Sequence, residues 1–90
     1  MKDPIILKPT GRRPVKINNA NVLGEATDGE NTVQIIRSGS GKICHWHLNS
    51  RLKKLKVYND EDDFAANAKM GFLTLKAAEA ANLDISEEIE

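Results

Sequence analysis

The sequence predicts an α+β fold, in which helices cover an antiparallel sheet. Two observations indicate this class. Short runs rich in alternating and β-branched residues, separated by glycine-containing turns, fill residues 15–48. From residue 49 onward, leucine, phenylalanine and alanine recur at helical spacing instead. We therefore expect a three- to four-stranded antiparallel meander with a short basic helix and a longer C-terminal helix packed on one face.

The length and composition fit one small globular domain. Ninety residues are enough for a single core of modest size. The chain is 40% hydrophobic and 29% charged, which argues against a wholly disordered protein. We expect one domain over residues 1–90, comprising an extended basic arm (1–14), an antiparallel sheet (15–48), two helices (49–83) and an acidic tail (84–90).

The first fourteen residues are punctuated by proline. Pro4, Pro9 and Pro14 stand five positions apart, and Arg12 and Arg13 lie between the last two. Proline has no amide donor and restricts the residue before it, so helices and central strands exclude it. The segment is therefore predicted to be an extended, positively charged arm.

Two turn motifs divide the next part of the chain into strands. Asp28-Gly29 lies between apolar runs and predicts a two-residue hairpin loop, because a type I′ turn needs positive φ at both central residues. Ser38-Gly39-Ser40-Gly41 predicts a second loop of four residues. We expect strands at residues 21–27, 31–37 and 42–48, with residues 15–17 as a candidate fourth strand.

The only tryptophan, the only cysteine and both histidines stand together in residues 44–47. Side chains alternate across a sheet, so Cys44 and Trp46 should face the core while His45 and His47 face the other way. Gly24 is expected to leave room for the indole. With the predicted loops, the core face carries Val22, Gly24, Val33, Ile35, Cys44, Trp46 and Leu48. The opposite, open face carries Leu23, Glu25, Thr32, Gln34, Ile36, Ile43, His45 and His47.

Two helices are predicted after the sheet. Leu48, Leu52 and Leu55 follow the spacing of a short basic helix, for which Asn49 or Ser50 is a candidate N-cap. The carboxylates of residues 60–63 then precede a longer helix at about 62–81, where they complement the helix dipole. We expect this helix to cover the Trp46 face. Its apolar stripe contains Phe64, Ala68, Phe72, Leu75 and Ala78, widened by Met70, Leu73, Ala77 and Ala80.

Charge is distributed unevenly along the chain. Residues 1–57 hold eleven lysines and arginines against four acidic residues, a net charge of +7, whereas residues 58–90 carry two against nine, a net charge of −7. Such asymmetry points to a polyanionic partner for the basic half. The favoured function is therefore RNA or DNA binding without catalysis or a cofactor. Its predicted contact residues are Arg12, Arg13, Lys16, Lys42, His45, His47, Arg51, Lys53 and Lys54.

The chief alternative is a protein-interaction module. In this interpretation the acidic half docks to a basic protein surface, as in an inhibitor or a homodimeric regulator. The alanine-rich helix would suit such contact. The residues assigned to this role are Asp60, Glu61, Asp62 and Asp63.

Three chemical motifs are weaker. His45 and His47, with Glu25 in the same predicted row, form a conceivable metal site that lacks a further ligand nearby in the sequence. The segment at residues 38–42 ends like a phosphate-binding loop, but it lacks that motif's first glycine and its final Ser or Thr. Cys44 points away from His45, so the histidine is not placed to activate it.

The sequence also bears on location. One cysteine cannot form an internal disulfide, which fits a reducing compartment. The apolar triplet near the N-terminus is too short for a signal peptide, and no run reaches the length of a membrane span. We expect a cytoplasmic protein without a membrane partner.

Overall fold

The structure, a computed structural model, describes residues 3–85 and has the predicted α+β class. Residues 86–90 of the expected acidic tail lie outside the described residues. The strands are β1 (Ile5–Leu7), β2 (Val15–Ile17), β3 (Asn21–Thr27), β4 (Thr32–Arg37), β5 (Ile43–Leu48) and β6 (Lys53–Tyr58). The helices are α1 (Glu61–Asn67) and α2 (Phe72–Ala80). Within residues 3–85, neither helix combines the length and apolarity needed to cross a membrane.

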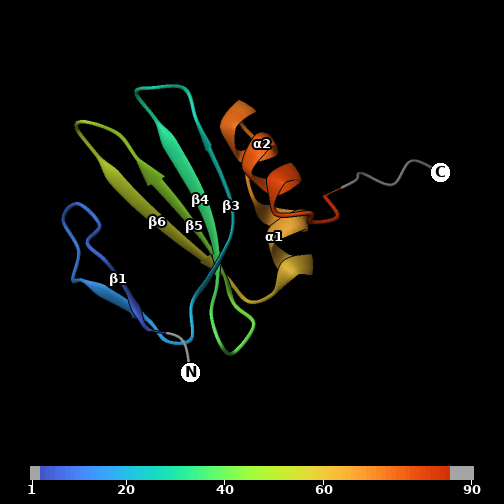
Figure 1. Cartoon of the computed structure of the whole chain (residues 1–90), viewed down its shortest axis with the longest axis horizontal. Coiled ribbons are helices and arrows are strands. Elements are labelled where there is room, and N and C mark those ends of the chain that lie inside the picture. Colours follow the sequence, from blue (N-terminus) through green and yellow to red (C-terminus); the bar gives the residue numbers. More distant parts are fainter. Residues whose placement is uncertain (1–2, 86–90) are drawn as a thin grey trace.

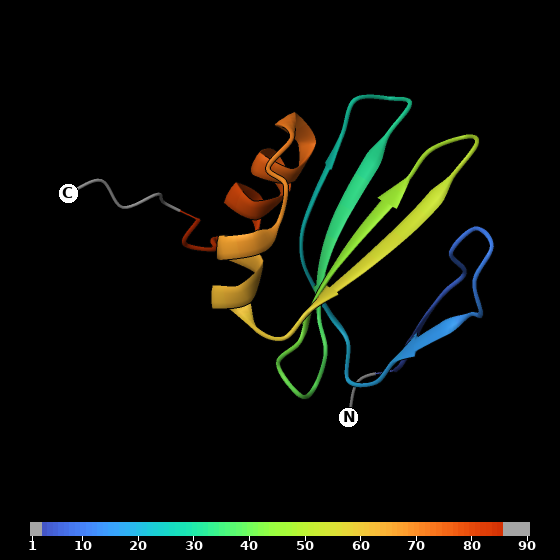
Figure 2. The same cartoon turned by 180° about the vertical axis from the view of Figure 1, so that it is seen from behind.

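The elements form three layers. Strands β3, β4, β5 and β6 make an antiparallel four-stranded meander in the middle. The hairpin β1–β2 covers one face of this sheet, and α1 and α2 cover the other (Figure 1). The view from behind shows the same order, with the sheet between the hairpin and the helices (Figure 2). We call the two faces of the meander the hairpin side and the helix side.

Three predictions for the hairpin side were wrong. Residues 1–14 were predicted to be an extended arm, but within the described residues 3–14 the strand β1 pairs with β2, with Ile5 opposite Ile17 and Leu7 opposite Val15. Residues 15–17 therefore pair with β1 and not with the meander. Since alternation sends Leu7 and Ile17 inward, the hairpin, and not the C-terminal helix, covers Trp46. The buried cluster is Leu7, Ile17, Ala20, Ile36, Cys44, Trp46 and Leu55.

The helix side holds a second core. Tyr58 and Phe64 meet edge to face, with ring centroids 5.3 Å apart. Helix α2 packs on β3 and β4, while α1 packs near β6. Gly24 does not make room for the indole; it allows α2 to approach, since a Cβ there would lie 2.3 Å from the carbonyl oxygen of Ala77. The buried cluster is Val33, Ile35, Ile43, Tyr58, Phe64, Ala77 and Ala78.

The alternation predicted for β5 is confirmed, but the register of β4 against β5 was wrong by one residue. Arg37 pairs with Ile43, so Ile36 lies opposite Cys44 and Ile35 opposite His45. A one-residue shift exchanges the two faces of a strand. Val33 and Ile35 therefore lie on the helix side, together with Gly24. Ile36 lies beside Trp46 on the hairpin side.

The turns explain this shift. The second loop is short, because Ser38 donates its amide to Lys42 O and Gly41 takes a φ of 92°. This is the three-residue hairpin with a left-handed last residue. The loop between β3 and β4 also differs from the prediction. The Asp28 amide donates to Asn31 O, so the two residues at the tip are Gly29 and Glu30 and not Asp28 and Gly29. A register shift in β3 between Val22 and Gly24 also moves Val22 opposite Ile36.

The predicted short basic helix is strand β6. The side chain of Asn49 accepts the amides of Arg51 and Leu52 at 2.8 and 2.6 Å, which is the bonding expected of a helix N-cap. Here, however, the Asn49 amide also donates to Leu52 O, and the turn closes a hairpin between β5 and β6. The β-branched Val57 and aromatic Tyr58 favour the strand.

The predicted long helix is divided in two. Ala68 is extended, with ψ at 138°, and Gly71 is the N-cap of α2. Glycine within a helix costs about 1 kcal/mol relative to alanine, so Gly71 favours a break over one continuous helix, although α1 already ends at Asn67. After the turn, α2 packs onto β3 and β4. Phe72 and Leu75 of the predicted apolar stripe are not buried there, since they are 70% and 39% exposed.

Candidate functional site

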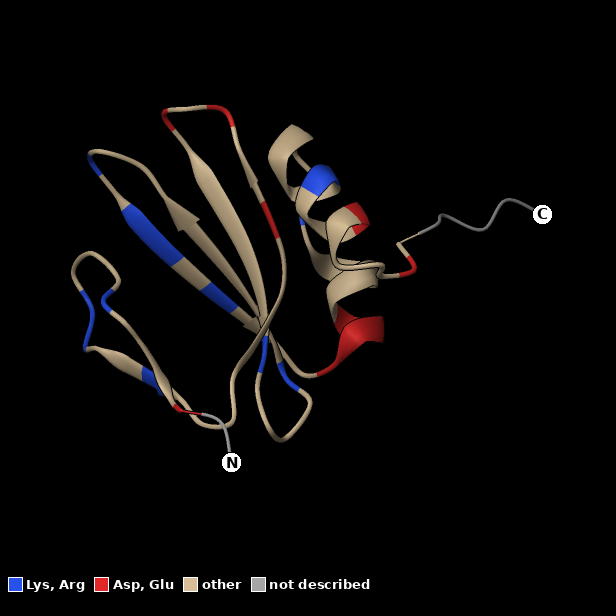
Figure 3. Cartoon of the chain, viewed as in Figure 1, with Lys and Arg blue, Asp and Glu red and all other residues tan. Residues whose placement is uncertain are grey.

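The most basic element of the molecule is β6, an edge strand of the meander (Figure 3). Its lysines point to both faces. Lys54 and Lys56 pair with His47 and His45, so they lie on the helix side. Lys53 pairs with Leu48 and lies on the hairpin side. All three lysines are exposed.

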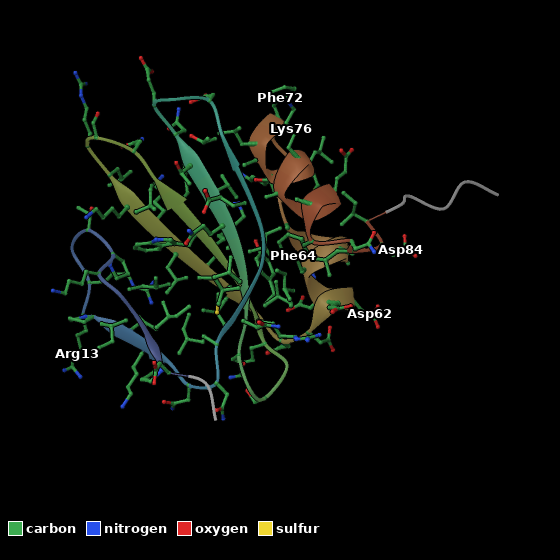
Figure 4. The ribbon with its side chains drawn as sticks, viewed as in Figure 1. Arg13, Asp62, Phe64, Phe72, Lys76 and Asp84 are labelled. Carbon is green, nitrogen blue, oxygen red and sulfur yellow. The ribbon has the colours of Figure 1, made fainter. Side chains whose placement is uncertain are left out.

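The loop between β1 and β2 closes the outer edge of β6. Thr10 donates its amide to Lys53 O at 2.9 Å, and its hydroxyl accepts the Lys53 amide at 3.0 Å. The Arg12 guanidinium donates to Leu55 O at 3.1 Å. Free strand edges invite pairing with other chains, and these bonds occupy part of this edge. Arg12 thus has a structural role, whereas the Arg13 side chain extends away from the fold (Figure 4).

We name this surface the basic edge. It combines the exposed cations of β6 with those of the turn before it and the hairpin loop beside it. The acidic residues lie chiefly on α1 and at the tip of the β3–β4 loop, where Glu30 lines a pocket together with Arg51 (Figure 3). The basic edge consists of Arg12, Arg13, Arg51, Lys53, Lys54 and Lys56.

The two histidines were predicted to lie on an open face. They lie instead on the helix side, half-buried against other elements. His45 Nε2 is 2.8 Å from the hydroxyl of Thr74 in α2. His47 Nε2 is 3.1 Å from Asn31 Oδ1, and because that oxygen only accepts, the imidazole donates. Burial lowers the pKa of His45, and the positive charges of His47 and Lys56 lower it further.

A pocket of about 320 Å³ opens next to the histidines. It lies between β5, β6 and the connection from α1 to α2, where the helices leave the sheet uncovered. Lys56 and Lys69, which sequence reasoning did not assign to a site, are among its walls. It is lined by His45, His47, Lys54, Lys56, Tyr58, Ala68 and Lys69.

The predicted contact residues therefore divide into separate groups. Arg12, Arg13, Arg51 and Lys53 belong to the basic edge, and Lys54 to both the edge and the histidine pocket. Lys16 and Lys42 lie apart from these groups. They line a cavity of about 370 Å³ between β2 and the β4–β5 loop, which also contains Ser38, Gly39 and Ser40.

The acidic run assigned to protein docking stabilises the start of α1. Asp60 is its N-cap and accepts the Asp63 amide at 2.8 Å. Asp63 in turn accepts the Asn59 amide at 2.8 Å and the Asn67 side chain at 2.6 Å. Glu61 forms an exposed ion pair of 3.6 Å with Arg37. Of the four acidic residues, Asp62 has its side chain directed away from the sheet (Figure 4).

The proposed metal triad is not formed. Glu25 pairs with Gln34, which pairs with Trp46, so its carboxylate lies on the hairpin side, opposite the histidines. It accepts the Gln34 side chain at 2.7 Å. Over residues 3–85 no cluster of three His, Cys, Asp or Glu side chains is suited to hold a metal ion. Cys44 is buried, and burial raises the pKa of its thiol, which disfavours the nucleophilic thiolate.

Comparisons with protein families, with curated proteins and with solved structures found no match for this chain.

Proposed function

We propose that this protein binds RNA or DNA through its phosphate backbone, along the basic edge. The observation that carries the proposal is the gathering of cations from distant parts of the sequence. The β1–β2 loop is bonded to β6 through Thr10 and Arg12, which brings Arg12 beside Leu55 although 43 positions separate them in the chain. Lysine and arginine along an exposed strand neutralise phosphates and release counterions, which makes affinity depend on salt.

The geometry suits a contact that follows a backbone. Lys54 and Lys56 project from the same face of β6, about 7 Å apart along the strand. Lys53 projects to the opposite face, so the strand carries positive charge on both sides. Contacts of this kind position a nucleic acid without reading its bases. Binding is therefore expected to be nearly independent of sequence.

The test removes two cations that hold no part of the fold together through their side chains. In Arg13→Gln/Lys53→Gln, the affinity for oligonucleotides of mixed sequence should fall, and the slope of log K against log salt should decrease by about 1.4 to 1.8. Fluorescence anisotropy at several salt concentrations measures both quantities. Arg12 is left intact because its guanidinium bonds to β6.

The matched control is Lys42→Gln/Lys76→Gln, which removes the same net charge away from the basic edge. Lys76 lies on the outer side of α2, with its ammonium 4.6 Å from the centre of the Phe72 ring (Figure 4). We expect this variant to retain the wild-type salt slope. Equal losses in the two double variants would instead indicate a diffuse effect of net charge, and unchanged binding in Arg13→Gln/Lys53→Gln would refute the basic edge.

A further inference from the structure

The histidine pocket has an unusual charge pattern. His45 lies directly opposite Lys56, and His47 directly opposite Lys54, in the pairing of β5 with β6. Lys69 reaches the same pocket from the connection between the helices. A protonated imidazole at either position would therefore face a like charge directly across the strand pair, which is destabilising. None of the lining residues, all within the described part of the chain, carries a carboxylate that would compensate these charges.

Carboxylates are present nearby, but they have other partners. Asp28 lines a neighbouring pocket that also includes both histidines, but its carboxylate accepts the amides of Glu30 and Asn31 at 3.0 and 2.8 Å. These bonds lower the pKa of Asp28 and keep it ionised. Burial raises the pKa of Tyr58, and the carboxylate of Asp63, which is held by the start of α1, raises it further. The pocket thus concentrates positive charge in a concave site, where electrostatic fields act most strongly on a ligand.

The fold keeps this pocket open. Helix α2 covers β3 and β4, and α1 reaches only the end of β6. Between them, Ala68 and Lys69 pass over β5 and β6 without helical structure. His45 and His47 are held from the other side by Thr74 and Asn31. The pocket walls are therefore positioned by both layers before any ligand arrives.

We propose that the histidine pocket binds the phosphate group of a phosphomonoester. Lysine is a common phosphate ligand, and three lysines from two elements surround the pocket. The volume of about 320 Å³ is at the lower end of small-molecule sites, which suits a phosphate with a small substituent or a chain end. The proposal goes beyond backbone binding at the basic edge, and either one can fail without the other.

The imidazole groups provide the direct test. Their Cε1–H signals are followed by NMR while inorganic phosphate, and then a nucleoside monophosphate, is added at constant ionic strength maintained with sodium chloride. Phosphate should shift the signals of both histidines and raise the pKa of His45, because a nearby anion favours the imidazolium form. If phosphate shifts neither signal beyond the chloride control, the pocket does not bind phosphate.

Two neighbouring lysines give a matched pair of variants. Lys54→Gln removes a lining cation, and Lys53→Gln removes the same charge one residue away, on the opposite face of β6. We expect Lys54→Gln, and likewise Lys69→Gln, to raise the Kd for phosphate about tenfold or more, as the loss of a hydrogen bond to a charged group predicts. Lys53→Gln should leave this Kd unchanged, and equal weakening by Lys53→Gln would overturn the proposal.

The source of the phosphate is resolved with two oligonucleotides of identical sequence, with and without a 5′-phosphate. Stronger binding of the phosphorylated strand, abolished by Lys69→Gln, would assign the pocket to a nucleic-acid end. Equal binding of the two strands, together with tight binding of the monophosphate, would assign it to a small phosphomonoester. Failure of backbone binding is recognised separately, as loss of affinity for the unphosphorylated strand alone.

Discussion

The two sides of the meander are built from the same strands but are covered differently. On the hairpin side, Trp46 and Cys44 are 4% and 3% exposed, and the small hairpin β1–β2 seals them. On the helix side, Ile35 and Phe64 are fully buried beneath the helices. There, however, the cover ends over β5 and β6, where His45 and its neighbours line an open pocket.

The difference suggests that the hairpin side serves mainly for packing and that the open part of the helix side is available for binding. The hairpin side gains stability from burying large apolar groups, for which no polar partner is needed. The helix side places lysines directly opposite histidines, an arrangement that costs stability when the imidazole is protonated. Proteins retain such unfavourable arrangements mainly where a ligand offsets them. The same strand, β5, thus contributes a core on one face and a candidate binding site on the other.

The largest expected effect comes from truncating the hairpin-side core. Trp46→Ala should lower the free energy of unfolding by about 3 to 5 kcal/mol, because it leaves a cavity beneath the hairpin. Strands β1 and β2 have three residues each, and an isolated two-stranded sheet is marginal. Chemical denaturation measures the loss. Hydrogen exchange should show β1–β2 losing protection before α2.

A control on the same face is Val57→Ala, since Val57 is 50% exposed. It should change stability far less than Trp46→Ala. Uniform loss of amide protection across both sides in Trp46→Ala would mean that the two layers unfold as one unit, and the contrast between them would then be one of packing only.

The second-largest loss of stability is expected where α2 covers the helix side. Gly24→Ala places a methyl group 2.3 Å from Ala77 O and 2.6 Å from Ala81 N, which are backbone atoms of α2 and its C-cap. We expect a loss of about 1 to 3 kcal/mol by overpacking, with protection lost first in α2. Gly71→Ala adds a methyl with no heavy atom within 4 Å and should cost less. Equal losses would show that steric approach of α2 is not the cause.

The sequence predicted those features that depend on neighbouring residues. Alternation in residues 43–48 correctly separated Trp46 from the histidines, and the carboxylates of residues 60–63 correctly indicated that a helix begins there. The α+β class followed from these local periods. The register could not be predicted in this way. A loop shorter by one residue exchanges the two faces of a whole strand, and the four residues Ser38–Gly41 permit either loop length.

Other errors arose where one local signal serves two structures. The Asn49 side chain accepts the amides two and three residues ahead both at a helix N-cap and in a hairpin turn. Only pairing with β5 decides between them, and that pairing is a long-range contact. The hairpin β1–β2 was missed for the same reason, since the apolar Ile5-Ile6-Leu7 finds its partner across the proline-rich loop.

The candidate site is formed by the elements that were predicted wrongly. Lys56 comes to lie opposite His45 only because β6 is a strand, and Lys69 reaches the pocket only because the predicted single helix breaks before Gly71. The charge asymmetry correctly identified β6 as part of the most basic region of the chain (Figure 3). It contained no information on which cations would share a pocket.

A smaller effect, of opposite sign, is expected in the open half of the helix side. Lys56→Thr removes the cation opposite His45 and introduces a β-branched residue, so stability should increase by about 0.2 to 1 kcal/mol at a pH low enough to protonate His45. The pKa of His45 should rise, because the charge of Lys56 helps to lower it. Denaturation and NMR titration measure the two quantities. Lys53→Thr, on the other face, should leave the pKa of His45 unchanged; a similar rise there would show that the effect is not local to the pocket.

The smallest effect is the dependence of stability on pH that His45 contributes on the helix side. Burial holds the pKa of His45 below its ordinary value of 6.5, so the unfolded chain binds more protons than the folded one between the two values. The free energy of unfolding should therefore decrease as pH falls from about 6.5 through the folded pKa of His45 and level off below it. Denaturation in buffers without phosphate measures this, and subtracting the same curve for His45→Gln removes the contribution of the carboxyl groups. Because bound phosphate favours the imidazolium form, adding phosphate should reduce the decrease in the free energy of unfolding on acidification. A difference curve that rises on acidification, or that is unchanged by phosphate, would show that His45 is not part of a buried, cationic pocket.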